Sequence, residues 1–130
     1  MYKVTIADVA EMTEEIRSVE FDSVVPENSE ARSSSIGVTL TIKGVVAYDT
    51  DKVFMKDSTK AIAEWSLLKP DSPDTYKSVT VDFDHTGVKR TYTLENAFVV
   101  SFHEEFEDQN GSFVLKVRQK KDRLVGVSVV

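Results

Sequence analysis

Cysteine is absent from the sequence, which excludes disulfide bonds, thiol catalysis and thiolate metal sites together. No apolar run approaches the length of a membrane span, so we expect no direct membrane insertion. The N-terminus also lacks the basic and then apolar layout of a signal peptide, and we expect a cytoplasmic protein. The formal net charge of −6 argues against nucleic acid as a partner, because phosphate neutralisation needs a basic face.

Motifs for nucleotide binding and catalysis are missing as well. There is no phosphate-binding glycine loop and no dinucleotide fingerprint. Residues 103–107 begin like the zinc-protease helix motif, but Glu107 stands where the second histidine must be. Ser101, His103 and Glu105 have the residue types of a catalytic triad, but on one face of a strand they stand side by side and form no relay. We therefore expect no catalytic residues and no cofactor.

Asp82, Asp84 and His85 are candidates for a metal site at the tip of a predicted hairpin. Asp82 and Asp84 share one face of a strand, where two carboxylates can hold a hard cation. Residues of these types are also common in turns for backbone reasons alone. We favour the turn interpretation and expect no metal.

Apolar and polar residues alternate over much of the C-terminal half of the chain, which predicts β-strands. The alternation runs through residues 88–94, continues through 98–106 and returns in 113–117. Between the last two runs, Asn110-Gly111 favours the positive φ angles of a tight hairpin turn. The pattern therefore predicts a β-meander that ends in a long hairpin.

Shorter runs of the same kind complete a mainly β protein. The other predicted strands cover residues 1–7, 19–25, 36–46, 76–83 and 124–130. Residues 36–46 are rich in β-branched side chains and are expected to form a central strand. Polar connections are predicted at 26–35 and 49–57. Residues 8–17 are ambiguous, because Val9, Met12 and Ile16 fit one face of a helix.

One helix is expected over residues 60–68, with its N-cap among Asp57, Ser58 and Thr59. Ala61, Trp65 and Leu68 would share its apolar face, and Trp65 is placed to plug the mouth of a sheet or barrel. Residues 1–130 then form one domain with seven or eight strands. This count favours a small antiparallel β-barrel or sandwich with one flanking α-helix.

Two charged patches favour assembly over catalysis. The basic patch near the C-terminus comprises Arg118, Lys120, Lys121 and Arg123. The acidic patch near the N-terminus comprises Asp8, Glu11, Glu14 and Glu15. Opposite patches on one subunit suit head-to-tail contact between copies, although two separately solvated faces explain them equally well. The first and last strands are further candidates, as sheet edges through which copies pair.

The order of these elements resembles a known family. A serine-rich loop at 31–35 precedes the β-branched strand 36–46 and the Trp-bearing helix 61–68. The strand Ala97-Phe98-Val99-Val100-Ser101-Phe102-His103-Glu104-Glu105-Phe106 and the hairpin after it carry the clearest likeness. Over residues 32–122 the sequence is similar to the Hcp tube protein of type VI secretion and to phage tail-tube proteins.

This resemblance implies a homo-oligomeric structural protein. Six copies would close into a ring with a wide channel, and rings would stack into the inner tube of a contractile injection machine. Residues 26–35 or 49–57 would reach the next ring. Sheath, spike or effector proteins would be further partners, and the tube would be exported as part of the apparatus. The family has no catalytic residues, in agreement with the motif search.

Two other hypotheses remain open at this point. A monomeric β-barrel could bind a peptide or carbohydrate through Trp65, Tyr48 and Tyr76, which predicts an exposed Trp65. A metal-dependent hydrolase or protease could use His85 or His103. We rank the tube subunit first and the enzyme last.

Overall fold

The computed structural model describes residues 1–24, 37–47, 58–120 and 126–130. The strands are β1 (Tyr2–Ile6), β2 (Ala10–Met12), β3 (Ile16–Val24), β4 (Gly37–Ala47), β5 (Lys77–His85), β6 (Val88–Phe106), β7 (Asn110–Gln119) and β8 (Val127–Val129). The described helices are α1 (Ser58–Ser66) and a 3-10 turn η2 (Pro73–Thr75). The predicted connections at 26–35 and 49–57 lie outside the described residues.

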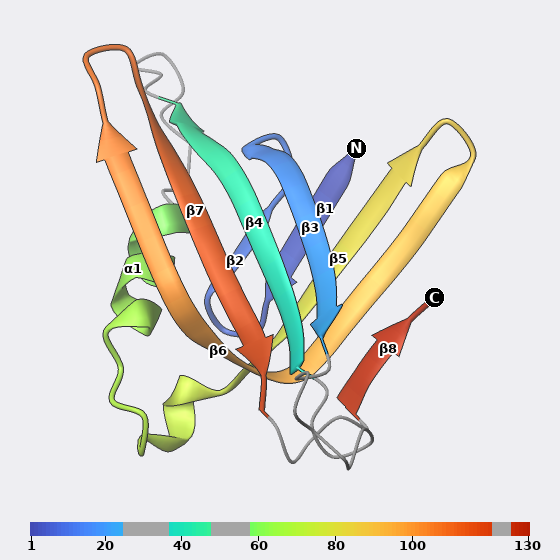
Figure 1. Cartoon of the computed structure of the whole chain (residues 1–130). Helices are drawn as coiled ribbons and strands as arrows, with labels where there is room; N and C mark the ends of the chain where they lie inside the picture. Colours follow the sequence, from blue (N-terminus) through green and yellow to red (C-terminus); the bar gives the residue numbers. More distant parts are fainter. Residues whose placement is uncertain (25–36, 48–57, 121–125) are drawn as a thin grey trace.

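All eight strands belong to one antiparallel sheet, in the order β2-β1-β5-β6-β7-β4-β3, with β8 paired to β6. The sheet does not close and folds over on itself like the two arms of a V (Figure 1). One arm contains β1, β2, β5 and β8, and the other contains β3, β4 and β7. The architecture is a small antiparallel sandwich with a flanking helix, as predicted.

Strand β6 is 19 residues long and runs through both arms. Its N-terminal part pairs with β5 on one side and with β8 on the other. From Ala97 onward it pairs with β7. The two alternating runs predicted at 88–94 and 98–106 are therefore one continuous strand. The predicted meander is confirmed as β5-β6-β7.

The core lies between the two arms and follows the period-2 pattern of the strands. Its buried members include Val4, Ile6, Leu40, Ile42, Val79, Val81, Leu115 and Val117. Phe21 of β3 stacks on Tyr92 of β6, with 4.6 Å between the ring centroids and 12° between the planes. This contact joins the two arms directly. Strand β4 lies between β3 and β7, which confirms the predicted central strand.

Helix α1 packs against β2 and β6. Trp65 is 3% exposed, and its Nε1–H donates to the Thr75 carbonyl oxygen over 2.8 Å, so its predicted role as a plug is confirmed. The predicted face is otherwise wrong, because Ile62 is buried with Trp65 while Leu68 is 38% exposed. The spacing of three residues puts Ile62 and Trp65 on the same side of the helix.

The helical option for residues 8–17 is wrong. The chain turns after β1 with Asp8 at a φ of 61° and returns as β2. Met12 is buried because it stands opposite Val4 of β1 in the ladder, not because it lies on a helical face. Two apolar residues four positions apart fit one face of a helix and also one face of a strand, so the pattern alone did not distinguish a helix from a strand.

The two hairpin turns differ from each other. The β5–β6 turn consists of Thr86 and Gly87, whose φ angles of 49° and 84° suit a two-residue hairpin. The expected turn at Asn110-Gly111 is wrong, because both residues belong to β7 and neither has a positive φ. The chain instead turns over 107–109, where the Glu107 N–H donates to the Asn110 carbonyl oxygen over 2.8 Å.

Gly44 of β4 stands directly opposite Phe113 of β7, whose ring occupies the space that a side chain at position 44 would need. A Cβ atom there would lie 2.6 Å from the Phe113 ring and 2.5 Å from the Glu15 carbonyl oxygen. Replacing Gly44 with a larger residue must therefore move the central strands or the turn before β3.

We expect Gly44→Ala to lower the free energy of unfolding by about 1–3 kcal/mol, the usual cost of overpacking a core. Urea denaturation measures the change. Gly37→Ala is the matched control on the same strand, because the nearest atom to its Cβ would be 3.8 Å away. Equal stability of the two variants would contradict the tight contact at Gly44.

Candidate assembly surface

The three metal candidates do not converge on one point. The Asp82 carboxylate accepts a hydrogen bond from the Thr91 hydroxyl over 2.7 Å, and the Asp84 carboxylate lies 3.9 Å from Lys89 Nζ. His85 is on the opposite face of the strand, where its ring lies 6.4 Å from that of Phe83. Within the described ranges, no three His, Asp or Glu side chains are placed to hold a metal ion.

Ser101, His103 and Glu105 lie along one face of β6 and point away from the core. His103 Nε2 is 2.9 Å from Glu105 Oε1, and both side chains are more than 60% exposed, at 65% and 63%. A solvated pair of this kind contributes little to stability. Its carboxylate contacts the imidazole, but Ser101 has no hydrogen bond to either. The arrangement offers no activated nucleophile.

The aromatic residues of the binding-module hypothesis are used for packing. That hypothesis predicted an exposed Trp65, and the burial of Trp65 shows this to be wrong. Tyr76 packs edge-on against Phe98 at 6.0 Å, and Lys120 Nζ lies 5.0 Å from the centre of the Tyr76 ring. Tyr48 lies outside the described residues. No aromatic platform is formed by Trp65 and Tyr76.

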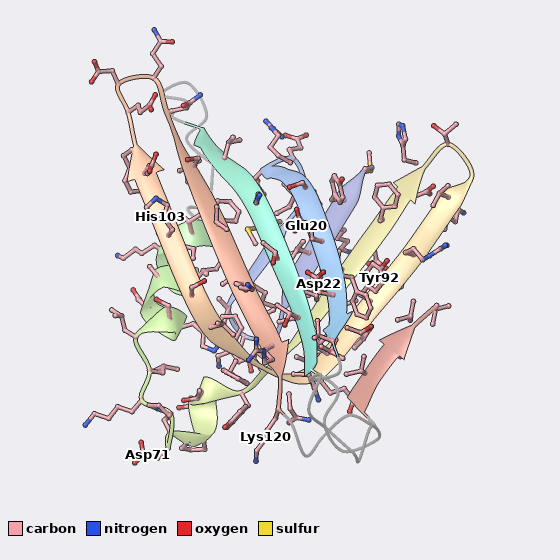
Figure 2. All side chains as sticks on the ribbon, in the orientation of Figure 1. Glu20, Asp22, Asp71, Tyr92, His103 and Lys120 are labelled. Atoms are coloured by element: carbon pink, nitrogen blue, oxygen red, sulfur yellow. The ribbon has the colours of Figure 1, made fainter. Side chains whose placement is uncertain are left out.

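Two members of each charged patch lie at opposite ends of the arm that contains β3, β4 and β7, whereas Asp8 and Glu11 belong to the β1–β2 hairpin. Glu14 and Glu15 lie in the turn before β3. The start of β3 pairs with Gly44 of β4, and Gly44 pairs with Phe113 of β7, so this turn lies at the Phe113 end of the arm. Arg118 is five residues further along β7, about 17 Å away at 3.3–3.4 Å per residue. Lys120 follows at the same end of the sheet (Figure 2).

Some members of these patches already have partners within the subunit. Glu11 lies 3.5 Å from Lys3, and the Glu15 carboxylate accepts a hydrogen bond from the Thr13 N–H over 3.1 Å. Arg118 Nε donates to the Thr39 hydroxyl over 3.4 Å. Lys121 and Arg123 lie outside the described residues, and Asp8 belongs to the turn after β1. The role of the patches at an interface stays a prediction.

The sheet edges differ from those that the sequence suggested. β8 is an edge strand, but β1 lies between β2 and β5 and is wrong as an edge. In the described part of the chain, β3 pairs only with β4, and residues 98–106 of β6 pair only with β7. We call β3, β4, β7 and residues 98–106 of β6 the assembly layer. This four-stranded layer has an unpaired edge on each side.

Apolar side chains are exposed at both edges of the assembly layer. Val24 at the end of β3 is 60% exposed, and on β6 Val100 and Phe106 are 42% and 61% exposed. On β3, Glu20 and Asp22 are also exposed (Figure 2) and lie on the same face of the strand as Val24. Unpaired strand edges with apolar side chains are the usual template for pairing with another chain.

An apolar cleft lies where β3 meets the arm of β5 and β6. Its volume is about 330 Å³, and it is lined by Tyr2, Val19, Val81, Phe83, Val88, Arg90 and Tyr92. Val19 comes from β3, whereas most of the other walls come from β5 and β6, so the cleft opens between the two arms. Sequence alternation places these residues inward but does not show that the arms diverge and leave space.

Comparisons with known proteins add little to this geometry. No family model matches the sequence, and no curated protein is significantly similar to it. Among solved structures, the chain is similar to one in the six-fold symmetrised cryo-EM structure of the anti-feeding prophage baseplate. The identity is 12% and the TM-score 0.49, over 99% of this chain and 90% of the other.

Neither described helix is long and apolar enough to cross a membrane. Among the described residues, unpaired strand edges and exposed apolar side chains come together on the assembly layer, and the cleft adjoins it.

Trp65 provides a test of the structural interpretation of the aromatic residues. We expect Trp65→Phe to lower the free energy of unfolding by about 1–3 kcal/mol, because the partly buried Thr75 carbonyl loses its donor. Urea denaturation followed by circular dichroism measures the loss. Tyr76→Phe is the control, since the Tyr76 hydroxyl makes no hydrogen bond among the described residues. Unchanged stability in Trp65→Phe would favour an exposed ligand platform instead.

Proposed function

We propose that this protein is a structural subunit that pairs with copies of itself, edge to edge through the assembly layer, into a closed ring. The observation that carries the proposal is the direction of the two edges. The layer has four antiparallel strands, so β3 and residues 98–106 of β6 run in opposite directions. A copy in the same orientation, placed beside the first, therefore presents β6 antiparallel to β3.

Pairing between two different edges is a heterologous contact, which closes into a ring when its rotation divides a full turn. Each copy uses both edges, so a closed ring leaves no edge of the layer unpaired. Pairing of β3 with β3 would instead give a two-fold dimer and leave residues 98–106 of β6 exposed. Burial of Val24, Val100 and Phe106 favours the arrangement that covers both edges.

The charged patches support stacking of such rings. The axis of a ring built this way would run broadly along the strands, with Glu14 and Glu15 at one end and Arg118 and Lys120 at the other. Rings stacked in one direction bring these opposite charges together. A stack of such rings is the tube that the sequence resemblance implies, and sheath or spike proteins would be its further partners.

We therefore assign the subunit to the inner tube of a contractile injection or phage-tail-like machine, with six copies in each ring. This assignment is supported by the resemblance of residues 32–122 to tube proteins and by the two complementary edges. It needs no catalytic group. Light scattering coupled to size exclusion tests it across a concentration series, with a hexamer of 14.6 kDa subunits as the expected mass. A monomer at every concentration would contradict the proposal.

Charges placed on the edges should block the ring while leaving the subunit folded. We expect Val24→Lys and Val100→Lys each to weaken association at least about tenfold, or ~1.4 kcal/mol, because a lysine at an edge resists strand pairing. Native mass measures the association, and circular dichroism confirms the fold. Leu67→Lys is the control, because Leu67 is 83% exposed at the end of α1 and belongs to neither edge. Equal association of all three variants would rule out pairing through these edges.

A further inference from the structure

The cleft between the arms has apolar walls and a single cationic side chain. Tyr2, Val19, Phe83 and Val88 are among its apolar and aromatic lining residues, and Arg90 supplies the charge. Arg90 Nη1 donates to the Lys89 carbonyl oxygen over 2.8 Å, but no described carboxylate forms an ion pair with its guanidinium. An occupant that combines an apolar side chain with a carboxylate would satisfy both features.

The β6–β7 hairpin carries this combination at its tip. Phe106 is 61% exposed at the end of β6, and Glu107 and Asp108 follow it in the turn. Both carboxylates are exposed, and neither forms an ion pair with a described cation. The hydrogen bond from the Glu107 N–H to the Asn110 carbonyl oxygen closes the turn, so the tip is held on a paired hairpin.

A single molecule cannot insert this tip into its own cleft. Val88 of the cleft and Phe106 of the tip are the two ends of β6, a strand of 19 residues. The chain between them spans about 60 Å along the strand at 3.3 Å per residue, and Figure 1 shows the two hairpins at the ends of different arms. The occupant with this chemistry is therefore a second copy.

We propose that the cleft is a socket for the β6–β7 hairpin of the neighbouring copy, with Phe106 between the arms and Glu107 and Asp108 against Arg90. The inference rests on the proposed edge pairing and deepens it. Val19 of β3 forms one wall of the cleft, so a neighbour whose β6 lies along β3 brings its hairpin to the cleft. The contact would fix how far each copy slides along the next, which hydrogen bonding alone leaves open at steps of two residues.

A charge exchange tests the socket. We expect Arg90→Glu, and separately Glu107→Lys with Asp108→Lys, to weaken self-association about tenfold, because each leaves like charges facing each other. Combining all three substitutions in one chain should restore most of the association, measured by sedimentation over a concentration series. Lys89→Glu is the matched control, because Lys89 is the adjacent residue on the opposite face and pairs with Asp84.

Disulfide trapping gives a second, independent measurement, made clean by the absence of native cysteine. Val88→Cys and Asp108→Cys chains are mixed and treated with a mild oxidant, and we expect a cross-linked dimer that contains one of each. Leu67→Cys mixed with Asp108→Cys is the control and should give far less product.

The outcomes separate the socket from the ring. If the parent chain assembles while Arg90→Glu has no effect and no specific cross-link forms, the socket is wrong and the edge pairing stands. If the parent chain is a monomer at every concentration, the proposed function and the socket are both overturned. Restored association in the combined charge variant, with a specific cross-link, supports both.

Discussion

The pairing of β6 is the constraint on which the rest of the structure depends. This strand hydrogen-bonds to β5 and β8 over its first half and to β7 over its second, so it holds both arms together. The register shifts between Val99 and Ser101, and again on β5 between Lys77 and Val79. Irregularities of this kind bend strands, and they lie where β6 passes from one arm to the other.

The unpaired edges of the assembly layer result from this change of partners along β6. Because β5 leaves β6 near Ala97, the rest of β6 has a partner on one side only within the described residues. At the other side of the layer, the outer edge of β3 has no strand partner among the described residues, since the chain before it turns away into β2 and β1. The divergence of the arms opens the cleft. The edges and the cleft that we assign to assembly therefore both result from the bend in β6.

Much of the fold could be predicted from the sequence, because alternation over 88–106 and 113–117 reports directly on burial. The turn predicted at Asn110-Gly111 was wrong. Gly111 lacks a side chain because the Phe106 ring lies against it, not because the backbone has a positive φ, and residue spacing does not distinguish these two reasons for a glycine. Of the edges, only β8 was predicted, and the edges of the assembly layer and the cleft were not. Alternation says which side chains face inward, but not which strands are neighbours.

The divided sheet also has a consequence for how the chain folds as it is made. β4 ends at Ala47, yet its partner β7 is complete only at Gln119. At roughly 5–20 residues per second, that gap is about 4–14 s of synthesis. Until then β3 and β4 form at most a two-stranded hairpin, which is marginal in water. The acidic residues Glu20 and Asp22 along β3 would keep that early intermediate apart from its copies on neighbouring ribosomes.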